Sequence, residues 1–249
     1  MAGEKLAIRT ADGTADAWLF RAPGGKRAPG VIYYCDALGM RAPALDMAER
    51  LSESGYTVLA PDLFYRSAPY QPFDGMTLFS SDSERARLMA MIGATPHELT
   101  RRDSEVFLDL MATEAPGPVG LVGYCFGGGR AMTAAGSYPA RVSAIAAFHA
   151  TRIATEEADS PHRVLPNMKA RLYFGVAGID PGFPPEEEGR LASTLRAADI
   201  DHTIETYRGV RHGFAVGGMS VYDHDAAERH WSRLLTFFSE TLQPGVTRQ

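Results

Sequence analysis

One cysteine of this 249-residue chain lies in a cluster of glycines, in the run Val122-Gly123-Tyr124-Cys125-Phe126-Gly127-Gly128-Gly129. A Gly-x-nucleophile-x-Gly turn between a strand and a helix holds the central residue in a strained backbone conformation, and the flanking glycines clear the space around it. The apolar run 118–124 predicts a buried strand, and 127–138 predicts a helix rich in small residues. We therefore predict that Cys125 is a nucleophile presented on a strand-to-helix turn.

A nucleophile in such a turn needs a base, here a histidine. Ligands of a parallel sheet bind beyond the carboxyl ends of its strands, so a histidine just after a strand can reach the site and one just before a strand cannot. His212 follows the predicted strand 203–207 and is the preferred base. His149 follows the predicted strand 142–148, but it precedes the carboxylate candidate, whereas the elbow order is nucleophile, acid, histidine. It stays an alternative base or a pocket-wall residue. The start of strand 203–207 places His202 at the opposite edge, and a surface position is expected for His97, His162, His224 and His230.

The preferred orienting acid is Asp180, which follows the predicted strand 171–176 and precedes His212 in the chain. Its other interpretation is an Asx-turn residue before Pro181. A cationic His212 and the N-terminus of the helix after Cys125 would both favour the reactive thiolate. The sequence thus predicts a triad of Cys125, Asp180 and His212.

Attack of a thiolate on a carbonyl creates an oxyanion, which needs N–H donors. The predicted donors are the backbone N–H of Phe126 and that of a residue just past the strand ending at Cys35, which we take to be Ala37. Asp36 lies beside Ala37, and its carboxylate could oppose ionisation of the thiol or accept the thiol proton, so Asp36 is a candidate gate for the nucleophile. A turn or capping role for Asp36 explains the same residue equally well.

The remaining pattern predicts an α/β fold, a mostly parallel central sheet with helices on both faces, in a single domain spanning 1–249. The stretch 66–83 is expected to be a lid or a surface excursion. Apolar runs predict strands over 6–9, 15–20, 30–35, 56–60, 118–124, 142–148, 171–176 and 203–207, the first two as an antiparallel hairpin or meander at a sheet edge. Helical periodicity predicts helices over 43–55, 83–92, 96–113, 127–138, 186–198 and 223–241.

Composition excludes several classes of protein. The net charge of -5 and the absence of a Lys/Arg run argue against nucleic-acid or anionic membrane binding. The N-terminus lacks a basic region followed by an apolar segment, so a cytoplasmic protein is expected. The chain holds two cysteines, too few for a disulfide framework or a cysteine-based zinc site, and we expect no metal and no cofactor.

Taken together, these motifs resemble the dienelactone hydrolase family of α/β-hydrolases over nearly the whole chain. They are the cysteine elbow Gly123–Gly128, the run Pro61-Asp62-Leu63-Phe64-Tyr65-Arg66, the Gly178-x-Asp180 loop and His212-Gly213-Phe214. The resemblance implies an α/β-hydrolase fold and a Cys125, Asp180, His212 triad. It implies hydrolysis of a small-molecule ester or lactone through an acyl-enzyme, as in a carboxymethylenebutenolidase. It also implies that an acidic residue at position 36 pairs with the resting thiol until substrate binds.

The chain departs from the family pattern at two positions. The family's gating residue is a glutamate, and Asp36 is one methylene shorter. Characterised dienelactone enzymes place an arginine four residues after the catalytic histidine to hold the substrate carboxylate, and here that position is Val216. Candidates for substrate contact near the site are then Phe214 and Val216, with a positive charge supplied by Arg66, Arg85 or Arg87 from the excursion or its flank. A solvated helix face is the other explanation of Arg85 and Arg87.

Two other functions stay open at this point. A thioester could replace the ester as the acyl donor without changing the residues. A non-hydrolytic thiol sensor or binding module is the second alternative, because Cys35 and Cys125 end neighbouring predicted strands and could form a disulfide. A monomer or a small homo-oligomer is expected in each case.

Overall fold

A mixed sheet forms the centre of the molecule. The computed structural model describes residues 3–23 and 25–242, and within them eight strands form the sheet in the order β1-β2-β4-β3-β5-β6-β7-β8. The strands are β1 (Glu4–Thr10), β2 (Gly13–Phe20), β3 (Gly30–Tyr34), β4 (Thr57–Pro61), β5 (Val119–Tyr124), β6 (Val142–Phe148), β7 (Arg171–Ile179) and β8 (His202–Arg211).

The first strands differ from the rest in direction. β1 and β2 form an antiparallel hairpin at one edge, with Thr10 opposite Gly13, and β2 also runs antiparallel to β4. The pairs from β4 to β8 are all parallel. The predicted hairpin at a sheet edge and the predicted mostly parallel sheet are therefore confirmed.

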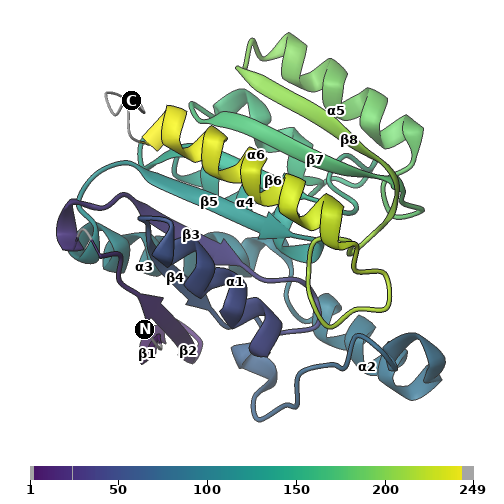
Figure 1. Ribbon diagram of the computed structural model, residues 1–249, viewed down its shortest axis with the longest axis horizontal. Helices are drawn as coiled ribbons and strands as arrows, with labels where there is room; N and C mark the ends of the chain where they lie inside the picture. The colour runs from purple at the N-terminus through teal and green to yellow at the C-terminus, as the bar shows by residue number, and fades with distance from the viewer. Residues whose placement is uncertain (1–2, 24, 243–249) are drawn as a thin grey trace.

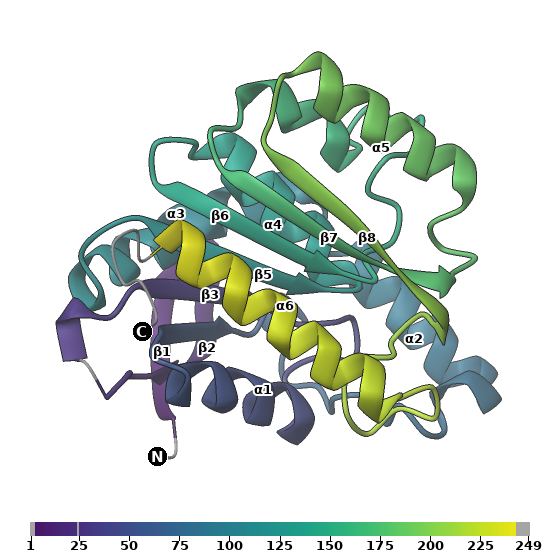
Figure 2. The ribbon, with the colours of Figure 1, turned by 45° about the horizontal axis from the view of Figure 1, so that its top comes forward.

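Helices cover both faces of the sheet. On one face lie α1 (Ala42–Glu53) and α6 (His224–Leu242), in front of the strands in Figure 1, and on the other lie α3 (His97–Glu114) and α4 (Phe126–Ser137). Figure 2 shows α6 lying along β5, β6 and β7. The outer helix α5 (Pro185–Ala197) packs on the 3-10 segment Pro161–Asn167, which packs on α4. The helix α2 (Asp82–Gly93) lies at the end of the sheet where the parallel strands finish (Figure 2).

Burial explains why the inner strands were readable from the sequence. Every residue of β3, β4 and β5 is buried, as expected for parallel strands covered on both faces, which appear as continuous apolar runs. The edge strand β8 is different, because only Tyr207 and Val210 in it are buried. Its polar residues carry no comparable pattern.

The last two strands extend beyond their predicted ends. β7 continues past Val176 to Ile179 and β8 continues past Tyr207 to Arg211, with an irregularity in their pairing between Ala177 and Ile179. Backbone pairing, which residue hydrophobicity does not report, holds these extensions together. As a result, β7 and β8 end directly before the aspartate and the histidine that the sequence had placed a few residues farther on.

The stretch 66–83 covers the end of the sheet and is anchored there. Its Phe73 is buried, and the Phe73 backbone N–H donates to the carbonyl of Leu38, 2.9 Å away. Short 3-10 turns occupy Tyr65–Ser67 and Leu78–Ser80 at its two ends. Whether this segment opens as a lid stays a prediction.

Candidate active site

Five of the parallel strands carry a polar or nucleophilic residue just past their carboxyl ends. Cys125 follows β5, His149 follows β6, Asp180 follows β7 and His212 follows β8, each directly, while Asp36 lies two residues after β3. Because the ends of parallel strands meet at one edge, the topology alone gathers these five side chains. This edge is the candidate active site.

The turn at Cys125 has the strained geometry that its glycines predicted. Cys125 has a φ of 53°, in the left-handed region that a side chain other than glycine rarely adopts. A Cβ at Gly123 would collide with the backbone of Gly127, and a Cβ at Gly127 would collide with the carbonyl oxygen of Tyr34. The three-glycine pattern therefore lets the start of α4 press against the ends of β3 and β5, which points the cysteine outward from the sheet.

His212 joins the cysteine to a buried carboxylate. Its Nδ1 lies 2.8 Å from Oδ2 of Asp180, and a hydrogen bond also links His212 to Cys125. The Asp180 side chain is 2% exposed and also accepts the backbone N–H of Gly182 at 2.9 Å. The Asx-turn interpretation of Asp180 is thus part of the arrangement, because one carboxylate oxygen holds the loop and the other holds the histidine.

The charges of Cys125 and Asp180 on either side of His212 favour the protonated form of this histidine. Burial by itself lowers the pKa of His212, but the negative charge of a Cys125 thiolate and hydrogen bonds with Asp180 and Cys125 outweigh burial and raise the pKa to about 10. His212 is therefore a cation at neutral pH when Cys125 is ionised. An imidazolium beside a thiolate is the arrangement that makes a cysteine nucleophilic.

Two free backbone donors lie beside the cysteine. Phe126 is the first residue of α4, and Ala37 lies in the turn after β3. Within the described ranges, the backbone N–H of neither residue has a hydrogen-bond acceptor. Both residues line the same cavity as Cys125. These donors are available to a ligand, which is the condition for an oxyanion hole.

Asp36 has a partner other than the thiol. Its two carboxylate oxygens accept hydrogen bonds from the Arg41 guanidinium at 2.7 and 2.9 Å, and Oδ1 also accepts the backbone N–H of Leu38 at 3.0 Å. No hydrogen bond between Asp36 and Cys125 occurs among the described residues, although both line one pocket. The turn role of Asp36 is present, and the gating role lacks the direct contact with the thiol that it requires.

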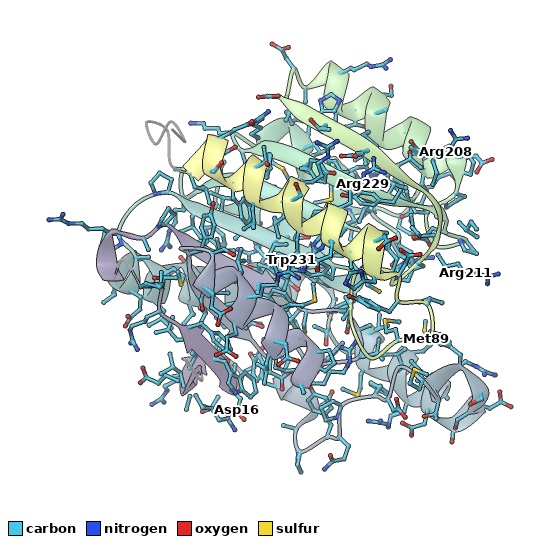
Figure 3. All side chains as sticks on the ribbon, viewed as in Figure 1. Asp16, Met89, Arg208, Arg211, Arg229 and Trp231 are labelled. Carbon is cyan, nitrogen blue, oxygen red and sulfur yellow. The ribbon has the colours of Figure 1, made fainter. Side chains whose placement is uncertain are left out.

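Cys125 lines two cavities. A small pocket of about 60 Å³ contains Cys125, His212, His149 and Asp36, and apolar side chains form most of its surface, among them Leu78, Phe79, Leu88 and Met219. A large pocket of about 410 Å³ contains Cys125, Phe126 and Arg130 and is lined mainly by α2, α4 and the loop after β6. Met89 of α2, labelled in Figure 3, belongs to the large pocket and is 63% exposed. The names small pocket and large pocket are used below for these two spaces.

The three arginines expected near the substrate lie elsewhere. Arg66 forms ion pairs with Asp12 and Asp103, both at 2.7 Å. Arg85 pairs with Asp82, and Arg87 pairs with Glu84 and stacks on the ring of Phe73. None of the three lines the small or the large pocket. Neighbouring carboxylates neutralise all three, and their contact with substrate stays a prediction.

Phe214 and Val216 also lie outside the two pockets in which a substrate could bind. Both are fully buried, and neither lines either pocket. Phe214 stacks on Tyr207 and lies edge-on to His149, with ring centroids 4.8 and 5.5 Å apart respectively. Phe214 therefore supports the wall of the site, and contact of Phe214 and Val216 with substrate stays a prediction.

His149 lies in the small pocket beside the preferred base. It is 1% exposed, has a φ of 38°, and its ring lies edge-on to that of His212 at 5.0 Å. Neither ring nitrogen of His149 has a hydrogen-bond partner in the described residues. Burial, followed by the nearby His212 and His230, holds the pKa of His149 well below its usual range. His149 is thus a neutral pocket-wall residue that has no carboxylate to orient it as a base.

Other sequence expectations need correction. His162 and His230 are buried, not at the surface, and His230 accepts or donates a hydrogen bond with the hydroxyl of Tyr124 at 2.8 Å. Helical periodicity does not mark a polar residue that finds its partner inside the core. Cys35 and Cys125 are both free thiols, so the disulfide proposed between them is wrong.

Sequence reasoning missed Arg130. This residue is 5% exposed and lies in α4 among glycines and alanines, where a long cation has no obvious partner. Its position between Gly129 and Ala131 was the only available signal, since a charged residue in an otherwise small-residue buried helix needs an explanation.

Neither a metal-binding cluster nor a membrane-spanning helix occurs among the described residues. Among residues 3–23 and 25–242, no group of three or more His, Cys, Asp or Glu side chains is arranged to hold a metal ion. Within the same ranges, no helix is both long and apolar enough to cross a membrane.

Comparison with known proteins finds relatives that match most of the chain. A model of the dienelactone hydrolase family matches residues 16–242. The Synechocystis protein named "Putative carboxymethylenebutenolidase" is 25% identical over 225 residues, which cover 86% of this chain and 87% of that protein. Protein usf of Aquifex pyrophilus is 26% identical over 86% of this chain and 89% of its own length.

Solved structures share the fold. A Klebsiella pneumoniae structure named "Putative Dienelactone Hydrolase" superposes with a TM-score of 0.82 at 19% identity, covering 96% of this chain and 98% of that one. The dienelactone hydrolase-like phosphotriesterase P91 from metagenomic libraries gives a TM-score of 0.73 at 24% identity, covering 96% and 99%. Since the family model spans most of the sequence, the chain belongs to the dienelactone hydrolase family of α/β-hydrolases, a family of ester and lactone hydrolases.

Proposed function

We propose that the chain hydrolyses a carboxylic ester or lactone through an acyl-enzyme on Cys125. The observation that carries the proposal is the hydrogen-bonded row from Cys125 through His212 to Asp180, placed beside two unused backbone N–H groups. A nucleophile, a base, an orienting carboxylate and an oxyanion site are the parts that acyl transfer requires.

The first half of the reaction forms the acyl-enzyme. The thiolate of Cys125 attacks the carbonyl carbon, and the oxyanion that forms accepts hydrogen bonds from the N–H groups of Phe126 and Ala37. The intermediate then collapses, the bond to the leaving oxygen breaks, and the His212 imidazolium donates its proton to that oxygen. The alcohol departs and the acyl group remains on sulfur.

The second half releases the acid. His212 is now neutral and removes a proton from a water molecule, which attacks the thioester carbonyl. The carbon–sulfur bond breaks, and Cys125 and His212 return to the thiolate–imidazolium pair. Throughout, Asp180 fixes the ring through Nδ1, so that the other ring nitrogen faces the reacting atoms.

Vinyl acetate is a suitable test substrate, because its small leaving group suits the small pocket and its acetaldehyde product is readily measured. Cys125→Ala and His212→Ala are each expected to lower kcat/KM by roughly a thousandfold or more. In the wild type, quenching during turnover should trap an acetyl group on Cys125, visible by mass spectrometry of the peptide.

Cys35→Ala provides the matched control. Cys35 is the other free thiol, it is fully buried, and burial keeps its pKa well above the usual range, so it stays protonated. The Cys35→Ala enzyme should turn over vinyl acetate and carry the trapped acetyl group. Undiminished turnover by Cys125→Ala would rule the proposed function out.

A further inference from the structure

Arg130 is a buried cation without a counter-charge. Its side chain lies in the first turns of α4, and its Nε and Nη1 atoms have no hydrogen-bond partner among the described residues. No carboxylate of those residues lies within ion-pair distance of it. The guanidinium lies over the face of Phe126, whose ring centroid is 4.3 Å from the guanidinium carbon. An unpaired buried charge is costly, so its presence needs a reason.

The groups around Arg130 leave its charge in place. Burial lowers the pKa of Arg130 to about 10, with Asp159 acting in the opposite direction, so the guanidinium remains a cation at neutral pH. The neighbouring His97 shares a hydrogen bond with Thr133 at 2.7 Å, and burial followed by Arg130 lowers its pKa to about 4. His97 is therefore neutral. Asp159 and Glu157 line the mouth of the large pocket but are exposed to solvent.

The guanidinium and the nucleophile face one space. Arg130, Cys125 and the oxyanion donor Phe126 all line the large pocket of about 410 Å³. His212 does not line that pocket and instead lines the small pocket, which shares Cys125 and Ala37 with the large one. The two cavities therefore present different chemistry to the two halves of an ester.

The reaction assigns each half of an ester to one cavity. The leaving oxygen must face His212, which protonates it, so the alcohol part extends toward the small apolar pocket. The carbonyl substituent extends the other way, past Phe126 and into the large pocket. A group at the far end of the acyl chain would then meet Arg130.

We propose that Arg130 binds a carboxylate at the far end of the acyl group, so that the preferred substrates are monoesters of dicarboxylic acids with a small apolar alcohol. This inference rests on the proposed function. A planar guanidinium matches the two oxygens of a carboxylate, and the match is strongest where water is excluded. The bound substrate would supply the counter-charge that the protein omits.

The test compares two methyl esters of similar length. Monomethyl glutarate carries a carboxylate at the end of its acyl chain, and methyl pentanoate carries a methyl group there. Loss of a buried charge pair corresponds to a factor of about 30 or more, so wild-type kcat/KM should favour monomethyl glutarate by at least about 30-fold. In Arg130→Met this ratio should fall to about one, mainly through a higher KM, while Arg130→Lys should retain part of it.

A second pair of substrates tests the assignment of the two halves. Acetoxyacetate carries its carboxylate on the alcohol side, and ethyl acetate is its neutral counterpart. The wild type should not prefer acetoxyacetate, because its charge would enter the apolar small pocket. A preference for acetoxyacetate that disappears in Arg130→Met would overturn the assignment.

Two controls separate the possible failures. Arg196→Gln makes the corresponding change at an exposed arginine of α5 and should leave the substrate ratio intact. Arg130→Met is expected to stay folded, because it removes a charge without breaking a pair, and thermal unfolding checks this. Equal use of both methyl esters by a wild type whose turnover depends on Cys125 would refute the Arg130 proposal alone. Turnover that does not depend on Cys125 would refute the proposed function.

Discussion

Two of the arginines and two of the histidines in or beside the site differ in one respect. Arg41 and His212 each have a buried carboxylate partner, at 2.7 and 2.8 Å, whereas Arg130 and His149 have none among the described residues. The pKa values of the two arginines shift in opposite directions. Burial opposes the charge of Arg41, but Asp36 raises its pKa above the usual value, while burial lowers the pKa of Arg130.

The paired groups have a carboxylate partner without a ligand, and the unpaired groups do not. Arg41–Asp36 fixes the turn that carries the Ala37 N–H, and Asp180 fixes the ring of His212. Arg130 and His149 instead line the walls of the cavities with unused polar atoms. We infer that the paired groups hold the site in shape and that the unpaired groups face what enters it. Each prediction below challenges one side of this comparison.

The largest effect on stability is expected when the paired arginine loses its partner. Asp36→Ala leaves the Arg41 guanidinium buried and uncompensated, and breaking a buried pair in this way costs about 3–5 kcal/mol of unfolding free energy. Guanidinium chloride unfolding of the purified variant measures it. Asp46→Ala, at an exposed aspartate of α1, should change stability little. If Asp36→Ala kept full stability but altered the alkylation rate of Cys125, a gating role would be favoured instead.

The paired histidine predicts a pH dependence. The folded pKa of His212 is about 10, above its ordinary value of 6.5, so the pair stabilises the fold fully below about pH 6.5 and this contribution is lost as the pH rises through about 10. Because the imidazolium donates the proton to the leaving oxygen, kcat/KM for vinyl acetate should fall over the same alkaline limb.

Asp180→Asn sharpens that test. The substitution removes the negative charge beside Nδ1 of His212, so the alkaline fall of kcat/KM should begin at lower pH. Turnover should decrease by a factor of up to about 10⁴. His224→Ala, at an exposed histidine at the start of α6, should leave the profile in place. A limb near pH 6.5 in the wild type would contradict the thiolate–imidazolium pair.

The smallest effect is expected for the unpaired histidine. His149→Phe removes an imidazole that has no hydrogen bond to lose, so unfolding free energy should change by less than about 1 kcal/mol. His230→Phe is the comparison, because His230 is equally buried but bonds to the hydroxyl of Tyr124 and to the carbonyl of Ala227. That variant should lose about 1–3 kcal/mol. Equal losses in urea unfolding would show that His149 has a structural partner after all.

The sequence by itself determined the framework and the residues of the predicted triad. Continuous apolar runs identified β3, β5 and β6 because strands buried on both faces tolerate only such residues. The glycines around Cys125 identified the turn because no Cβ fits there. Positions after strand ends then selected Asp180 and His212, since the topology of a parallel sheet fixes which edge they reach.

Only the tertiary structure decided how charges are paired. Arg66, Arg85 and Arg87 resembled ligand-binding cations in the sequence, but folding brings carboxylates to each of them. Asp36 resembled a gate for the thiol, but Arg41 holds its carboxylate. Arg130 attracted no attention, yet its buried guanidinium has no carboxylate partner among the described residues and lines the same cavity as the nucleophile. Strand and turn patterns are local and therefore legible in the sequence, whereas the partner of a charge depends on residues that meet only after the chain has folded.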